Sequence, residues 1–101
     1  MITKRVDQDH YTEIAIWNEG DIPAYQSYRV TCMDVDYDTK ADKRVPPTAR
    51  ISLLTSTQAD VDSTRRLAAE YIYVADIAEA LQAEKRTAYA DRYAAAIRDA
   101  T

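Results

Sequence analysis

The stretch from Thr57 to Ala100 contains neither glycine nor proline, and it constrains the fold more than any other feature of the chain. It is rich in alanine, glutamate, arginine and leucine, which lose little side-chain freedom in a helix. The single glycine and all three prolines precede it. We therefore expect a helical C-terminal segment, and a first half made of strands and turns.

Apolar side chains recur within this stretch at steps of four and three residues. That spacing places them on one face of a helix, which predicts that this face packs against a core. The residues on this apolar stripe are Leu67, Tyr71, Val74, Ala78 and Leu81.

The stripe changes character after Leu81. Continuing the same steps puts the basic side chains Lys85 and Arg92 on it, whereas Tyr89 and Tyr93 start a series that is out of step. A rigid helix cannot turn its core-facing side within a few residues, so a distortion is expected where the two series meet.

We accordingly predict a break or kink within Gln82–Thr87 and two helices, over about residues 58–82 and 87–100. The alternative is one rod of about 43 residues and about 64 Å at 1.5 Å per residue. A domain of this length has a radius of gyration of about 13 Å. Such a rod would overhang its own domain, and an overhang is useful where its end meets a partner.

Polar residues before the stripe indicate where the helix begins. Thr55 and Gln58 have the spacing of a capping box. Asp60 and Asp62 place negative charge in the expected first turn, which favours the positive end of the helix dipole.

The first half predicts a small antiparallel sheet of about three strands, near residues 11–17, 24–38 and 48–54, packed against the helical segment. Residues 1–10 are expected to form an arm or a short lead-in strand. Together these elements predict a single α+β domain of residues 1–101. The residues expected to alternate on one face are Thr12, Ile14 and Ile16, then Tyr28, Val30 and Cys32, then Ala49, Ile51 and Leu53.

Three local signals modify this sheet. Met33, Val35 and Tyr37 alternate in the opposite phase to the preceding residues, so we expect a bulge or bend near Cys32–Met33. Gly20 lies in a polar turn and is expected at positive φ. The segment 45–47 (Val-Pro-Pro) cannot donate to a central ladder, so it belongs at an edge or outside the sheet.

Charge and composition disfavour several functions. The chain carries 17 acidic and 13 basic residues and a net charge of −4, with no dense basic patch, so direct binding of nucleic acid is not expected. No apolar run is long enough to span a bilayer, and no signal-like start is present. The lone cysteine rules out an internal disulfide. These features favour the reducing cytoplasm of a bacterial or host cell.

Catalytic signatures are also missing. His10 and Cys32 are the only residues of their types, so the usual zinc ligand sets cannot be built. Cys32 sits within a strand pattern and lacks the signatures of an activated nucleophile. One glycine cannot supply a phosphate-cradling loop. We therefore expect no enzyme activity and no cofactor.

The sharpest local motif is the row Asp34, Asp36 and Asp38. It has the spacing of an EF-hand start, but Thr39 stands where that loop needs glycine and Val45 where it needs glutamate, so we expect no metal. On a strand these carboxylates project from one face. They form either a solvated face or a docking edge for a basic partner.

A second acidic group lies on the helix, where Glu70, Asp76 and Glu79 are predicted off the stripe together with Glu84. With the strand acids they could form one face that imitates a nucleic-acid backbone, or an ordinary solvated exterior. Tyrosine is frequent, with eight copies and no phenylalanine, and it is enriched at interfaces. The candidate partner-binding residues are Asp34, Asp36, Asp38, Tyr37, Glu70, Asp76, Glu79, Tyr89 and Tyr93.

These observations favour a non-enzymatic protein-binding module with a basic protein partner. In size, acidity and lack of catalytic signature the chain resembles small phage-encoded anti-defence proteins, including anti-CRISPR inhibitors. No motif is shared, so no residue roles carry over. The resemblance implies an inhibitor of a nucleic-acid-handling complex. The alternative is a phage or bacterial assembly subunit, such as a neck, tail or scaffold component, and self-association stays open.

Overall fold

The computed structural model describes residues 1–22, 26–54 and 58–100, with side chains up to residue 94. The capping role predicted for Thr55 lies outside these residues. The elements in chain order are β1 (Ile2–Asp7), β2 (Tyr11–Trp17), β3 (Ser27–Met33), β4 (Asp36–Asp38), β5 (Lys43–Val45), β6 (Arg50–Ser52) and α1 (Val61–Ala100).

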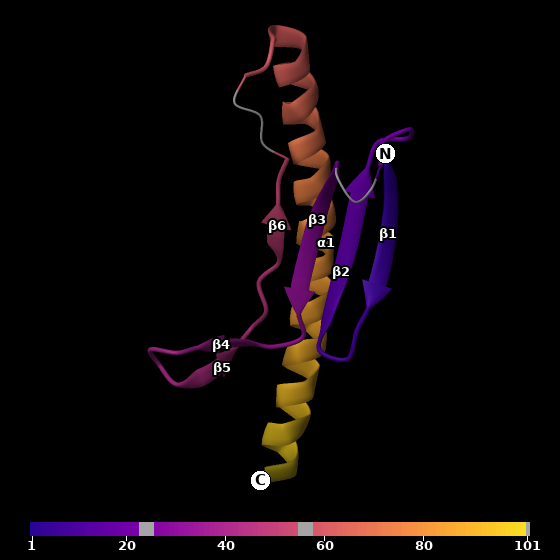
Figure 1. The fold of residues 1–101 in the computed structure, drawn as a ribbon. Coiled ribbons are helices and arrows are strands. Elements are labelled where there is room, and N and C mark those ends of the chain that lie inside the picture. The colour runs from indigo at the N-terminus through magenta and orange to yellow at the C-terminus, as the bar shows by residue number, and fades with distance from the viewer. Residues whose placement is uncertain (23–25, 55–57, 101) are drawn as a thin grey trace.

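The predicted α+β class is confirmed. Strands β1, β2, β3 and β6 form an antiparallel sheet in the order β1-β2-β3-β6, and β4 and β5 form a second, two-stranded sheet. Helix α1 runs along one face of the larger sheet, next to β3 and β6, while β1 lies at the far edge (Figure 1).

The faces predicted for the first two strands are confirmed, because alternating side chains of β2 and β3 meet α1. The cross-strand pairs are Thr12 with Cys32, Ile14 with Val30, and Ile16 with Tyr28. All six side chains are buried. On the helix, Val74, Ala78 and Leu81 of the predicted stripe complete the core, with Tyr71 packed at its margin.

The structure decides between the alternatives for the N-terminal segment and corrects the long second strand. Of the arm or short lead-in strand expected at residues 1–10, the strand forms: it is β1, six residues long and paired with β2 along its whole length. The long strand over 24–38 is wrong, because the chain bends at Asp34–Val35 and the residues beyond it join the second sheet. The phase change near Cys32–Met33 therefore marks the end of a strand. Gly20 has the expected positive φ, at 90°.

The third predicted strand is shorter in the structure and covers only Arg50–Ser52. Only part of its predicted alternating face packs against the core. Ile51 and Leu53 are 37% and 45% exposed, whereas Ala49 packs against the core. The segment 45–47 lies outside the four-stranded sheet, as expected. The β4–β5 ribbon to which Val45 belongs projects sideways from the body near the end of β3 (Figure 1).

Helix α1 is continuous over 40 residues, so the predicted break within Gln82–Thr87 is wrong. Polar side chains in this segment anchor the neighbouring loops and keep the helix in register with them. Gln82 Oε1 accepts from the amide of Ala49 at 2.9 Å. Arg86 Nε donates to the carbonyl of Pro47 at 2.7 Å. The segment in which the break was predicted is thus held to the loop before β6 by polar contacts.

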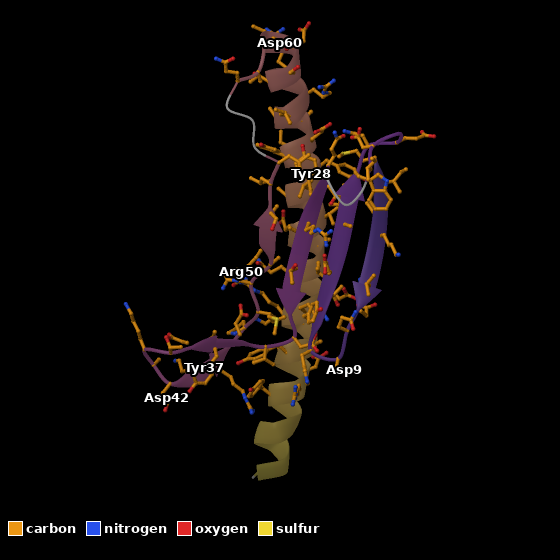
Figure 2. The ribbon with its side chains drawn as sticks, in the orientation of Figure 1. Asp9, Tyr28, Tyr37, Asp42, Arg50 and Asp60 are labelled. Atoms are coloured by element: carbon orange, nitrogen blue, oxygen red, sulfur yellow. The ribbon has the colours of Figure 1, made fainter. Side chains whose placement is uncertain are left out.

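The helix begins at Val61, three residues later than predicted, because Asp60 is its N-cap. Asp60 Oδ1 accepts from the amide of Ser63 at 2.7 Å, and the Asp60 carbonyl accepts from the amide of Thr64 at 2.9 Å. The Ser63 amide lowers the pKa of Asp60. Figure 2 shows Asp60 at the start of the helix, well beyond the sheet.

The long helix gives the molecule an elongated shape. Its extents are 60 × 27 × 19 Å and its radius of gyration is 16.9 Å, against about 13 Å for a compact domain of this length. The helix extends past the sheet at both ends (Figure 1). The single overhanging rod, which was the alternative prediction, is the structure that forms.

Candidate functional site

The aspartate row does not form one line of free carboxylates. Asp34 lies in the β3–β4 bend, where its Oδ1 accepts from Lys85 Nζ at 2.5 Å. Asp36 Oδ2 accepts from the amide of Thr48 at 2.8 Å. Asp38 Oδ1 accepts from two amides of the β4–β5 turn, at 3.0 and 3.2 Å. Each carboxylate therefore stabilises a local turn or a loop contact.

Tyr37 stands between two of these aspartates on the exposed ribbon. Its side chain is 54% exposed, and its hydroxyl donates to Asp42 Oδ1. Both residues lie on the part of the ribbon that extends away from the helix (Figure 2). Tyr37 is therefore open to a partner.

Glu70 does not lie on an exposed acidic face, which corrects the prediction. It is only 9% exposed. Its Oε2 accepts from the hydroxyl of Tyr28 at 2.5 Å, and its Oε1 accepts from Asn18 Nδ2 at 2.8 Å. Burial, together with the Glu70 carboxylate, raises the pKa of Tyr28. Glu70 precedes Val74 by four residues, so helical spacing alone places it toward the sheet.

Asp76 and Glu79 do lie on the open side of α1, facing away from the sheet. Both are exposed, and neither makes a hydrogen bond or ion pair within the described residues. Beside them are Ile72, 65% exposed, and Tyr73, 41% exposed. We call these four residues the outer patch. The sequence prediction missed Ile72 and Tyr73, although their positions off the stripe already indicated exposure.

Tyr89 and Tyr93 stack on each other one turn apart, with ring centroids 4.4 Å apart and planes at 39°. Desolvation and the neighbouring Tyr93 raise the pKa of Tyr89. This pair lies on α1 beyond the last core residue, Leu81. It gives the overhanging part of the helix a fixed aromatic surface.

A groove opens where this overhang faces the end of the sheet. One pocket of about 290 Å³ is lined on the helix by Glu84, Lys85, Ala88, Tyr89 and Arg92. An adjoining pocket of about 480 Å³ is bounded by Met33 and by Asp9 and His10 of the β1–β2 turn. The two pockets share Asp34, Val35 and Arg92. We call the combined space the Arg92 groove.

The structure thus brings two sequence candidates, Asp34 and Tyr89, to the same groove, with Tyr93 stacked on Tyr89, and leaves the remaining candidates on other surfaces. Arg92 is the groove residue that the prediction did not select. The available signal is its position on the continued apolar stripe, where the basic side chain led us to predict a break instead. In a continuous helix the same position faces the end of the sheet.

Catalytic or metal chemistry gains no support from the described side chains. No group of three or more His, Cys, Asp or Glu residues among them is arranged to hold a metal. Cys32 is buried, and desolvation raises the pKa of its thiol, which disfavours the reactive thiolate. Over the same described residues, no helix combines the length and apolarity needed to cross a bilayer.

Comparisons with known proteins give no assignment. Neither a family model, nor a curated protein, nor a solved structure matches the chain. Function must therefore be argued from the surfaces themselves.

Proposed function

We propose that this protein is a non-enzymatic protein-binding module whose outer patch docks on a basic protein surface. The observation that carries this proposal is the combination of two exposed apolar side chains with two unpartnered carboxylates on the open face of α1. Ile72 and Tyr73 supply the apolar contact, and Asp76 and Glu79 supply the charge.

The exposed apolar residues contribute little to folding. Ile72 is 65% exposed although the same helix buries Val74 completely. Isoleucine is also a weaker helix former than alanine, which fills much of the surrounding surface. Large apolar and aromatic side chains at the centre of an interface typically supply most of its binding energy. A binding role accounts for residues that the fold does not need.

The carboxylates determine which partner fits. Among the acidic candidates from the sequence, only Asp76 and Glu79 are both exposed and unpaired in the described part of the chain. They are three residues apart on one helix face and therefore act together. Unpaired acids at the rim of an interface speed association with a basic partner and help to select it.

More specifically, the protein is an inhibitor of a nucleic-acid-handling complex, and its outer patch occupies a basic groove of that complex. The overall negative charge and the absence of a dense basic patch support this role. The rigid helix presents the carboxylates with little loss of conformational freedom on binding, which favours affinity.

The test is a pull-down against a panel of purified nuclease and other nucleic-acid-handling complexes, followed by measurement of affinity for any complex retained. The double variant Asp76→Asn/Glu79→Gln should weaken binding about tenfold or more and reduce its dependence on salt. Glu19→Gln/Asp62→Asn makes the same change in net charge elsewhere and should leave affinity nearly unchanged. Binding that is insensitive to the outer-patch variant contradicts the proposal.

The second candidate is an assembly subunit, and the overhanging helix specifically favours it. A 40-residue helix that extends past its sheet exposes surface on which further subunits could pack. Light scattering at high protein concentration tests this candidate. A strict monomer with an intact helix counts against it.

Such assembly would not use the free edge of β1. Antiparallel pairing with a second copy must match residues on the same sheet face. The two registers with most overlap then place Lys4 opposite Lys4, or Arg5 opposite Arg5. Like charges directly opposite each other destabilise a sheet, and charged edges are a common protection against self-pairing. Self-association through the overhanging helix α1 avoids this repulsion.

A further inference from the structure

The Arg92 groove is a second surface, separate from the outer patch. It lies past the end of the sheet. Its helix residues are on the same face of α1 as the earlier helix residues that pack against the core. Arg92 follows Val74 by 18 residues, which is five full helical turns, so both side chains leave α1 in the same direction. Val74 meets the sheet, whereas Arg92 faces open space below it.

Arg92 is the cation in this groove that remains unsatisfied. Lys85 is paired with Asp34 at 2.5 Å, and Glu84 is paired with Arg5 at 2.9 Å. Arg92 makes no hydrogen bond or ion pair within the described residues, although it lines both pockets. Its guanidinium presents a planar set of donors that matches a carboxylate.

The walls of the groove are fixed by local contacts. The amide of Asp34 donates to the carbonyl of His10 at 2.9 Å, which ties the β1–β2 turn to the β3–β4 bend. The ion pair of Asp34 with Lys85 ties the same bend to the helix. Tyr89 is held by its stacking on Tyr93. A ligand would enter a largely preformed site, which limits the cost of ordering.

We propose that the Arg92 groove binds the free carboxyl end of a partner polypeptide whose last side chain is aliphatic. The terminal carboxylate pairs with Arg92. The aliphatic side chain occupies the smaller pocket beside Val35, Ala88 and Tyr89. The preceding peptide amide points toward the larger pocket, where Asp9 can accept a hydrogen bond.

Charge selects this ligand over a phosphate group. In the groove and its immediate rim, Asp34 is paired with Lys85 and Glu84 with Arg5, which leaves Arg92 and Asp9 as the charges without a partner in the described residues. A single carboxylate matches the one free guanidinium, whereas a dianion would leave a negative charge unmatched beside Asp9. The carboxylate of Asp9 can accept a hydrogen bond, which a peptide amide donates and a simple fatty acid does not.

The test is a titration of the ¹⁵N-labelled full chain followed by NMR, with acetyl-Ala-Ala-Leu carrying a free carboxyl end. Saturable shifts are expected at residues 9–10, 33–35 and 88–92. Arg92→Gln should weaken binding about tenfold or more, because it removes a charge-assisted hydrogen bond. Arg65→Gln is the matched control: it removes an exposed and unpaired arginine of the same helix, and binding should persist.

Two further ligands make the outcome decisive. The same peptide with a C-terminal amide should bind at least about tenfold more weakly, and equal binding of the amide overturns the proposal. Isovalerate supplies the carboxylate and the branched chain without a peptide amide. If isovalerate binds as tightly as the peptide, the claim that the ligand is a polypeptide is overturned. Absence of saturable shifts with the free-acid peptide overturns the whole. None of these results depends on Asp76 or Glu79.

Discussion

The buried hydrogen bond from Tyr28 to Glu70 is the contact whose loss is expected to be most informative about the fold. Tyr28 is fully buried and Glu70 is 9% exposed, and their oxygens are 2.5 Å apart. Tyr28→Phe deletes only the hydroxyl. It keeps the ring, which packs edge-to-face on Tyr71 with centroids 5.9 Å apart.

The magnitude follows from the charge on the acceptor. A hydrogen bond to an ionised group contributes about 1.5–3 kcal/mol, against about 1 kcal/mol for a neutral pair. Glu70 keeps its bond from Asn18, and it also borders a pocket of about 300 Å³ from which water can approach. We therefore expect Tyr28→Phe to cost about 2 kcal/mol. That corresponds to a fall of about 10 °C in Tm for a chain of this size.

Urea denaturation followed by circular dichroism measures the change, and two comparisons isolate its cause. Tyr37→Phe is the same substitution at a 54% exposed residue whose hydroxyl also bonds an aspartate, so it should cost less than about 0.5 kcal/mol. In a Glu70→Gln background the acceptor is neutral, and Tyr28→Phe should cost only about 1 kcal/mol. An equal cost in both backgrounds, or a cost no larger than that of Tyr37→Phe, would refute the reasoning.

Three other outcomes can be checked by the same denaturation assay. Leu81→Ala should cost about 3 kcal/mol because it opens a cavity in the core, whereas Ile72→Ala should be nearly neutral; a large cost at Ile72 would show that the outer patch serves folding. Lys85→Met should cost about 1 kcal/mol, since its ion pair to the β3–β4 bend is only partly shielded. The hydroxyl of Thr12 lowers the pKa of Asp7, so Asp7→Asn should destabilise at pH 7. This difference should shrink as the pH falls below 3.8, the ordinary pKa, and a pH-independent difference would contradict the assignment.

The side chains that face the core from each strand were predictable, because successive side chains of a strand point to opposite faces of the sheet. Once Ile14 and Ile16 face the core, the alternation places their neighbours outside, and the same holds for Val30 in the partner strand. The ends of the strands were less predictable. The opposite phase of Met33 and Val35 indicated an irregularity, but the sequence did not show that the chain leaves the sheet there and starts a second one.

The helix break was predicted wrongly because a basic residue on an apolar stripe has two interpretations. It can mark the end of the buried face, or it can be buried with a partner. Lys85 is the second case, since it pairs with Asp34 in the β3–β4 bend, 51 residues earlier in the chain. Gln82 and Arg86 bind loop backbone in the same way. These partners are distant in sequence, so helical periodicity cannot reveal them.

The same limitation applies to the candidate site. Sequence patterns identified the acidic residues, but only tertiary contacts show which of them are already used. Glu70 accepts two internal hydrogen bonds, whereas Asp76 and Glu79 accept none from the described residues. Arg92 was set aside for its charge, and that charge is the reason it now marks a groove.

The continuity of α1 also determines how the two proposed surfaces relate to each other. Ile72 and Arg92 are 20 residues apart, which in an unbroken helix is about 30 Å along the axis and about 200° around it. The outer patch and the Arg92 groove therefore open on nearly opposite sides of the rod. The polar contacts of Gln82 and Arg86 hold this part of the helix to the loop before β6 and leave the outer side free. A partner on one surface does not cover the other, so the chain has the geometry to bind two proteins at once.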